Sequence, residues 1–414
     1  MMGFVMLMNI APIERSPHPV LNLGFRIFFL SAAGFAIITM LMWYAILVGW
    51  LDFTASLNPV YWHGYQMLFG YALAVIAGFL LTAVKAWTGV PMPVGWRLFA
   101  IFLPWLIARI LWIVVIAINN PLLILLAMAA DVLFWLLVML AVLQAVLVVR
   151  QKRQLGIVAK LVLLLLCQLT FAVGTLSNQQ EMQRLALYTA LFVIVGVVFT
   201  IGRRVLPFFI EKGVAVLPDG TPSGIQAKLH NSLLVDRLSL LVFFGLMLAY
   251  LYDSNSYLVS ALAVSAAIIN AVRLCWWHHV GIWQKPLLWS LYLAFWGMVL
   301  ALLMIAILPW FSFGASLGLH ALALTAIGMT TVAMMARVSL GHTGRNIHKP
   351  PKTVVLMFVL MMASFILRVF APMVATDYLL VLGLSQLCWM GCFVLFLCAY
   401  AKILVSPRID GLMG

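Results

Sequence analysis

The sequence predicts an all-α, polytopic membrane protein with twelve transmembrane helices and both termini in the cytoplasm. Apolar residues make up 66% of the 414 residues and charged residues only 8%, whereas about a quarter of a soluble domain is charged. The chain contains twelve apolar stretches of about 20 residues or more, a length that crosses a bilayer as a helix. The basic residues also alternate between successive polar breaks, as expected of cytoplasmic loops.

Helices are expected because backbone polar groups inside a bilayer must be satisfied within the segment itself. A β-barrel is excluded, since its strands would need only about ten residues of alternating hydropathy. In chain order, the predicted spans are 24–50, 60–84, 97–117, 121–149, 157–176, 184–202, 233–252, 257–280, 286–309, 314–340, 353–371 and 377–405.

The polar breaks set the predicted orientation. Those after the first, third, seventh, ninth and eleventh spans contain no lysine or arginine, and the one after the fifth has Arg184 beside Glu181. The net charge of +14 therefore follows topology, and we expect a lipid bilayer and no nucleic acid as partner. The breaks after the second, fourth, sixth, eighth and tenth spans carry Lys85, Arg150, Lys152, Arg153, Arg203, Arg204, Lys212, Lys228, Lys285, Arg345, Lys349 and Lys352.

Two six-helix halves are expected, at 24–202 and 233–405. A cytoplasmic connector at 203–232 joins them and contains the turn signal Pro218-Asp219-Gly220. Residues 1–23 and 406–414 form the predicted cytoplasmic N-terminal segment and tail.

Arg109 and Asp131 lie well inside the third and fourth spans. Both are about ten positions from the tight turn at 119–121, so an antiparallel hairpin would place them at the same depth. Ionisable groups at membrane depth usually face the protein interior. We expect the two to pair, either as a structural ion pair or as part of a site for a cofactor carboxylate or a proton.

His63 and His320 are the histidines of greatest interest. The predicted topology places both in the outer third of the membrane, in helices that enter from outside. Neutral imidazole is a common ligand of haem iron and copper, although a membrane histidine is also often a hydrogen-bonded core residue. Met67 lies near the His63 face. His342 is roughly 33 Å from His320 at helical rise, so those two cannot share one metal.

The order of motifs along nearly the whole chain resembles the NnrS family, whose members are multispanning, haem- and copper-associated membrane proteins linked to nitric oxide. The motifs are Phe25-Arg26-Ile27-Phe28-Phe29-Leu30, Trp62-His63, Met67-Leu68-Phe69-Gly70, Ala77-Gly78-Phe79-Leu80-Leu81-Thr82-Ala83-Val84, Trp87-Thr88-Gly89, Gly202-Arg203-Arg204-Val205-Leu206-Pro207-Phe208-Phe209, Pro286-Leu287-Leu288-Trp289, His320 and Ala336-Arg337-Val338-Ser339-Leu340-Gly341-His342-Thr343-Gly344-Arg345.

This resemblance implies haem b, and a bacterial inner-membrane location. His63, His320 and His342 are then the candidate metal ligands, and Arg109, Arg337, Arg345 and Met67 the further cofactor-binding candidates. The chain departs from the family where it carries Tyr65, Gln66 and Tyr292 in place of a histidine, a glutamate and a histidine. Fewer imidazoles weaken the expectation of copper more than that of haem.

Three functions follow as hypotheses. The first is a haem protein that binds or turns over nitric oxide in denitrification or nitrosative-stress defence; as an enzyme it would be an oxidoreductase with an electron donor. The second is a transporter of a small anion or metal complex. The third is a non-catalytic sensor or assembly factor. The segment at 341–345 is expected either to cap its helix or to form a second, inner site for a cofactor or an anion.

Overall fold

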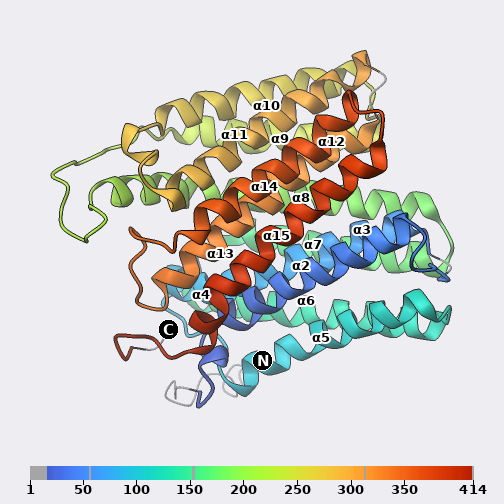
Figure 1. Cartoon of the computed structure of the whole chain (residues 1–414), viewed down its shortest axis with the longest axis horizontal. Coiled ribbons are helices and arrows are strands. Elements are labelled where there is room, and N and C mark those ends of the chain that lie inside the picture. The colour runs from blue at the N-terminus through green and yellow to red at the C-terminus, as the bar shows by residue number, and fades with distance from the viewer. Residues whose placement is uncertain (1–15, 56, 152–153, 312–313, 413–414) are drawn as a thin grey trace.

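The computed structural model describes residues 16–55, 57–151, 154–311 and 314–412. These residues fold into a helical bundle, and they contain no β-strand beyond an isolated bridge between Val216 and Pro222. Figure 1 shows the helices running side by side along the long axis of the molecule.

The predicted number of membrane helices is confirmed, because twelve helical stretches of the described chain are long and apolar enough to cross a bilayer. They are α2 (Gly24–Leu47), Pro59–Thr88, α5 (Trp96–Ala117), α6 (Pro121–Val149), α7 (Leu155–Leu176), α8 (Gln180–Val214), α9 (Leu233–Tyr252), α10 (Tyr257–Trp276), α11 (Pro286–Ile307), Ser316–Gly341, Thr353–Met373 and α15 (Tyr378–Val405).

Three of these spans are composite. The second consists of α3 (Pro59–Tyr65), a π-helical stretch η2 (Gln66–Ala72) and α4 (Leu73–Thr88). The tenth consists of α12 (Ala315–Ala323), a second π-helical stretch η6 (Leu324–Met329) and α13 (Thr330–Gly341). The eleventh is α14 (Thr353–Val369) followed by the short 3-10 turn η7 (Ala371–Met373).

Short polar side chains start several of the helices. In each case a side-chain oxygen accepts a hydrogen bond from a backbone N–H of the first turn, which would otherwise have no partner. This capping is seen at Asn58, Asn120, Ser232, Ser256 and Asp377. The breaks that the sequence shows as polar therefore also contain the local signals that begin the next helix.

The structure differs from the sequence-based prediction in one helix bound and in one internal irregularity, and both matter for function. α8 continues to Val214, whereas its span was predicted to end at 202, so the first part of the 203–232 connector is helical. Pro207 lies inside this helix. The tenth helix also contains the η6 stretch, which hydropathy alone does not reveal.

Both ends of the described chain lie at the same end of the bundle (Figure 1). There the buried Arg26 donates from Nη1 to the carbonyl oxygens of Leu404 and Ser406, both at 2.8 Å. These two hydrogen bonds hold the start of α2 against the end of α15. We call this end, which also carries Lys85 and Arg203, the basic end, and the opposite end the far end.

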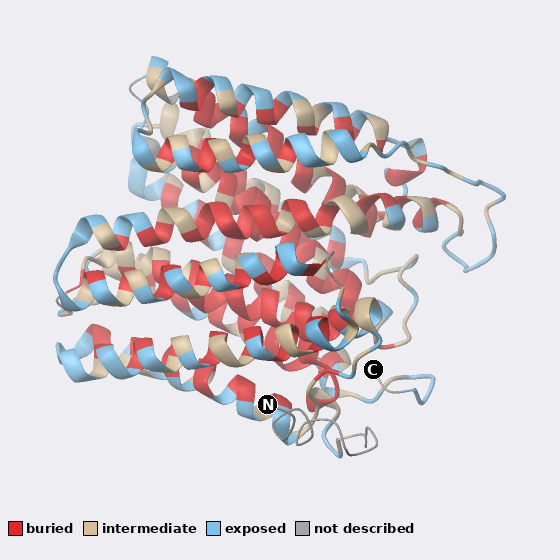
Figure 2. Ribbon diagram, turned by 180° about the vertical axis from the view of Figure 1, so that it is seen from behind, coloured by how far each residue is buried: buried red, intermediate tan, exposed pale blue. Residues whose placement is uncertain are grey.

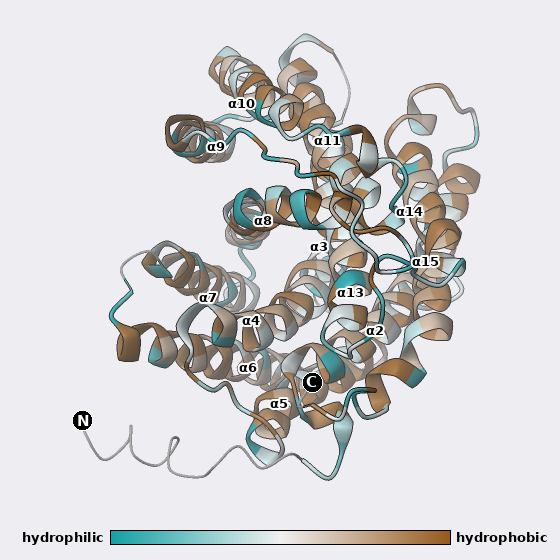
Figure 3. Ribbon diagram, turned by 90° about the vertical axis from the view of Figure 1, so that its left-hand side faces the viewer, coloured by the Kyte–Doolittle hydropathy of each residue, from teal (hydrophilic) through white to brown (hydrophobic). Residues whose placement is uncertain are grey.

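Helices differ strongly in how deeply they are buried, as Figure 2 shows. In the most apolar part of each span, 78% of the residues of Pro59–Thr88 are buried inside the bundle, but only 28% of those of α9. The outward faces are nonetheless apolar (Figure 3), since lipid and not water surrounds them. The second span is thus central, and α9 is peripheral.

Small residues let the central helices approach closely, and the second span carries Gly70, Ala74 and Gly78 at four-residue spacing. A Cβ atom on Gly78 would lie 2.8 Å from Cβ of Phe28. The second and tenth spans are joined near mid-bundle by a 2.7 Å hydrogen bond between the hydroxyls of Tyr71 and Thr331.

The orientation of the bundle in the membrane remains a prediction of the basic breaks. Reporter fusions placed after Asp52 and after Lys152 should report opposite sides of the membrane, with the second in the cytoplasm, because the intervening segment crosses three times. Paired alkaline phosphatase and fluorescent-protein fusions measure this directly. Two fusions on the same side would contradict the topology.

Candidate functional site

His63 and His320 both lie at the far end, each shortly before a π-helical stretch. His63 is in α3, three residues before η2, and His320 is in α12, four residues before η6. π-Helical turns inside membrane helices are frequent at functional sites because they rotate the side chains that precede them. The two spans that carry the candidate ligands thus share the same irregularity at the same place.

The two histidines are also at similar depth. From the Tyr71–Thr331 hydrogen bond, His63 lies eight residues and His320 eleven residues toward the far end, or about 12 and 16 Å at helical rise. The two rings interact electrostatically with one another and with the guanidinium of Arg368. The far end therefore brings together two imidazoles and one arginine.

His63 is held by an aromatic neighbour. Its ring stacks on the indole of Trp43 with centroids 4.6 Å apart and planes 10° from parallel. Its Nδ1 atom is buried and has no hydrogen-bond partner among the described residues. A buried polar atom without a hydrogen-bond partner lowers the stability of the fold. A ligand, a proton acceptor or a metal at this nitrogen would remove that penalty.

His320 is oriented by its own helix. Nδ1 lies 2.7 Å from the carbonyl oxygen of Ser316, which can only accept, so Nδ1 carries the proton and Nε2 carries the lone pair. Metal-binding histidines commonly have this arrangement, with the non-ligating nitrogen donating to a carbonyl. Nε2 is therefore the ring nitrogen whose lone pair is open to a metal or a hydrogen-bond donor, and Nη2 of Arg368 approaches it to 3.5 Å.

Arg368, near the end of α14, is a site residue that the sequence analysis missed. It is only 9% exposed. Its Nη2 lies 3.2 Å from Oγ of Ser316 and 3.5 Å from Nε2 of His320, and Nη1 is buried without a partner. Its position at the far end of a span was the available signal.

The predicted pairing of Arg109 and Asp131 is confirmed, and both side chains are buried. Asp131 also accepts hydrogen bonds from the hydroxyl of Tyr65 at 3.1 Å and from Nε1 of Trp112 at 3.0 Å. Arg109 donates from Nη1 to Oε1 of Gln66. Because Gln66 is one helical turn from His63, this network supports the turn on which His63 lies.

The residues at which the chain departs from the expected family pattern are therefore engaged elsewhere. Tyr65 and Gln66 belong to the Arg109–Asp131 network, and the hydroxyl of Tyr292 donates to the carbonyl oxygen of Leu274 at 3.0 Å. Met67 is half-buried and packs against the apolar core. None of the four adds a nitrogen ligand to His63 and His320.

The segment at 341–345 lies at the basic end and ends α13, as expected. His342 is the C-cap, and its carbonyl oxygen accepts from Nη1 of Arg408 at 3.3 Å. Burial, together with the charge of Arg408, lowers the pKa of His342. Gly344 has φ +74°, and a Cβ there would lie 3.0 Å from Oδ2 of Asp410. The C-terminal tail thus covers this turn.

Two arginines near this segment, Arg337 and Arg345, make different contacts. The guanidinium of Arg337 lies 3.8 Å from the ring centroid of Phe209, in a cation–π contact. Nη1 of Arg345 lies 3.4 Å from the carbonyl oxygen of Thr343. These contacts fit a helix cap, and they bring no second histidine to His342.

Comparison with protein families identifies the chain. A model of the NnrS family, described as NnrS protein, matches residues 19–408. The chain belongs to the NnrS family. A comparison with curated proteins found no match.

For this NnrS protein, the far-end residues fit a haem better than a copper ion. A haem needs one or two axial ligands, and His63 and His320 are two imidazoles with an arginine beside them, a number that would suffice for a haem. A copper site of several nitrogens would need more. Among the described residues, no group of three histidine, cysteine, aspartate or glutamate side chains could hold a metal ion.

A cavity of about 80 Å³ lies deeper in the NnrS bundle, between α2, α4, α8, α11 and α13. Its walls are apolar apart from Thr330 and Thr331, and include Phe29, Phe79 and Phe295. It is too small for a porphyrin, and its lining residues on the second span, 75–79, lie more than three helical turns beyond His63. It is therefore not the place of the cofactor proposed for the histidines.

Proposed function

We propose that this NnrS protein is a haem b protein of the bacterial inner membrane that binds nitric oxide at the far end of the bundle. The observation that carries the proposal is the pair of imidazoles at matched depth: His320 with Nδ1 held by Ser316, and His63 with a buried, unpartnered Nδ1. Both imidazoles would ligate the iron, and Arg368 would pair with a propionate. When bound, the haem would supply an iron centre that captures nitric oxide in exchange for one of the two imidazoles.

The protein's own residues would orient the site and keep water from it. Trp43 fixes the plane of the His63 ring. The Arg109–Asp131 network holds the adjoining turn through Gln66. Nitric oxide is small and apolar and partitions into lipid, so a site at bilayer depth is within its reach.

Replacing His63 or His320 by alanine should abolish or shift the Soret band of the purified protein, because each change would remove one of the two imidazoles proposed to hold the haem. The absorption spectrum of the reduced protein, recorded with and without nitric oxide, measures this. His230→Ala is the matched control, because that ring packs edge-on against Trp276 at the basic end and should leave the spectrum unchanged.

Two results would reject the proposal. One is a folded but colourless wild-type protein that takes up no haem on reconstitution, which would favour transport of a small anion or metal complex. The other is an unchanged wild-type spectrum in both histidine variants, which would place the haem elsewhere.

A further inference from the structure

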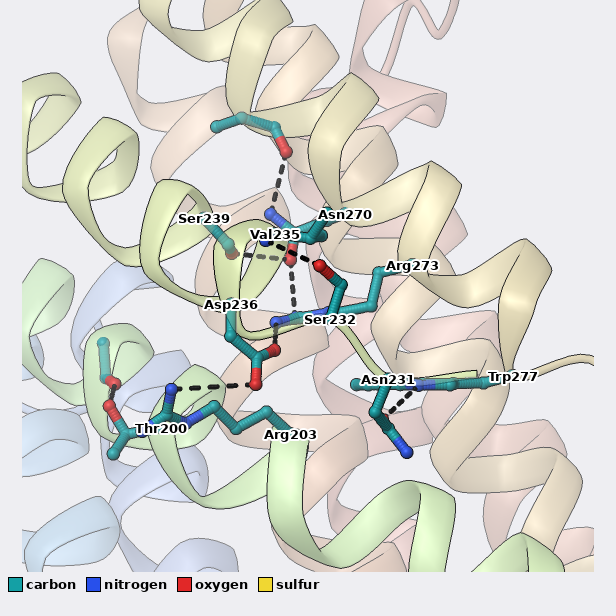
Figure 4. A network of polar contacts seen from close by, with 12 residues as sticks. Thr200, Arg203, Asn231, Ser232, Val235, Asp236, Ser239, Asn270, Arg273 and Trp277 are labelled. Atoms are coloured by element: carbon teal, nitrogen blue, oxygen red, sulfur yellow. Dashed lines mark hydrogen bonds and ion pairs between the residues drawn. The ribbon is translucent and has the colours of Figure 1, made fainter. Parts of the chain in front are cut away.

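A second cluster of charges lies at the basic end, on α7 to α10, at the opposite end of the bundle from His63 and His320. Part of it is drawn in Figure 4. Asp236 of α9 lies between two arginines: Nη1 of Arg273 is 3.5 Å from one carboxylate oxygen, and Nη1 of Arg203 is 3.8 Å from the other. Lys160 of α7 extends the cluster, since it interacts electrostatically with Arg203 and Arg204. Arg204 itself donates from Nη1 to Oε1 of Gln154 at 3.0 Å.

Arg273 has a structural role in this cluster. It is 3% exposed and donates from Nη2 to Oδ1 of Asn270 at 2.6 Å. Its guanidinium lies 4.9 Å from the Trp277 ring centroid. Asn270 is itself held by Ser239 and by the carbonyl oxygen of Ala266. Arg273 is thus built into the contact between α9 and α10.

Arg203 is different, because not all of its nitrogen atoms have a hydrogen-bond partner among the described residues. Its side chain is 21% exposed, its distance to Asp236 is beyond hydrogen-bonding range, and its Nε is buried without a partner. Lys160 crosses toward the same face of α8: its Cε lies 3.6 Å from the Cβ position of Gly196, two turns before Arg203. Its ammonium donates only to the carbonyl oxygen of Gly156, at 3.1 Å, among the described contacts.

The charges of the cluster do not balance. Among the described residues, Arg203, Arg273 and Lys160 carry three positive charges against the one carboxylate of Asp236, which leaves an excess of two. Lys160 is five residues into α7, or about 8 Å from its start, and so lies within the apolar span Leu155–Leu176. Several positive charges close together at that depth are unfavourable unless an anion lies beside them.

The apolar side chains around the cluster indicate which kind of anion would bind there. Seen from the basic end, α8 lies between α7 and α9 along one side of the bundle (Figure 3). The flanking helices expose large apolar side chains there, including Leu155 at 49%, Leu233 at 72% and Leu234 at 66%. A soluble anion would gain nothing from these residues, whereas acyl chains would pack on them while the phosphate meets the basic groups.

We propose that Lys160 and Arg203 bind the phosphate of an anionic phospholipid of the adjoining leaflet. Basic clusters between membrane helices are well suited to such headgroups, and a guanidinium binds phosphate oxygens with directed hydrogen bonds. Asp236 keeps Arg273 within the α9–α10 contact and leaves Arg203 to the lipid.

The test uses the full-length protein in nanodiscs of phosphatidylcholine, with or without phosphatidylglycerol. Anionic lipid should raise the thermal unfolding temperature of the wild type, and native mass spectrometry should detect retained phosphatidylglycerol. Lys160→Gln and Arg203→Gln should each lower the retained lipid by about fivefold, because one basic residue near an anionic headgroup contributes about that factor. Lys85→Gln, an exposed basic residue on α4 at the same end, is the matched control.

If Arg203→Gln fails to fold, the double variant Arg203→Lys with Lys160→Gln replaces it. This variant keeps a positive charge at position 203 and should still retain less phosphatidylglycerol than the wild type. The proposal is overturned if phosphatidylglycerol gives no more stability than phosphatidylcholine, or if the Lys85 control loses as much lipid as the cluster variants. It is also overturned if inorganic phosphate in solution stabilises the protein as much as the lipid does, which would indicate a site for a soluble anion.

Discussion

Replacing Arg109 by leucine should destabilise the folded protein by about 3–5 kcal/mol, because it leaves the carboxylate of Asp131 buried without its partner charge. Asp131 is fully buried, so water cannot take the place of the guanidinium. Arg109 also donates to Gln66 and lies over the ring of Phe35, 5.3 Å from its centroid. Purified yield and the thermal unfolding temperature in detergent measure the effect, and any haem content should fall with them.

Two further variants show whether the loss of stability comes from the unpaired charge on Asp131 or from the substitution itself. In Arg109→Leu with Asp131→Leu, no lone charge remains, so part of the stability should return. Arg184→Leu breaks the exposed pair with Glu181, whose side chain is 78% exposed, and should cost less than about 1 kcal/mol. If Arg109→Leu behaves like Arg184→Leu, the ion pair does not stabilise the interior of the bundle.

Gly202→Ala should destabilise the protein by about 1–3 kcal/mol through overpacking between α8 and α11. A Cβ atom at this position would lie 2.1 Å from Cζ of Phe295 and 2.8 Å from its Cε1. Phe295 is itself 3% exposed, so its ring cannot swing aside without displacing core neighbours. The unfolding temperature in detergent should fall.

Gly34→Ala is the matched control, since Gly34 is also within a membrane helix but a Cβ there would meet nothing within 4 Å. This change should leave stability unchanged or raise it slightly, because alanine is the better helix former. A Gly202→Ala protein as stable as Gly34→Ala would show that α8 and α11 can separate at this point without cost.

The sequence alone was enough for the number of helices, most of their bounds and the depth of the charged residues. A bilayer has a fixed thickness, so each run of apolar residues reports where a helix crosses. The turn at 119–121 gives Arg109 and Asp131 equal depth, and their pairing followed from that. The family assignment rested on local motifs such as the one that ends in Gly341-His342-Thr343-Gly344-Arg345, and the match over residues 19–408 confirms it.

Only the tertiary structure decided which side chains face one another. It placed Arg368 against His320, engaged Tyr65 and Gln66 with the buried ion pair, and showed the π-helical stretches beside both histidines. The physical reason is that depth is set by each helix separately, whereas rotation and neighbours are set by packing between helices distant in the chain. Lipid is as apolar as the core, so hydropathy does not distinguish the face of a membrane helix that meets protein from the face that meets lipid.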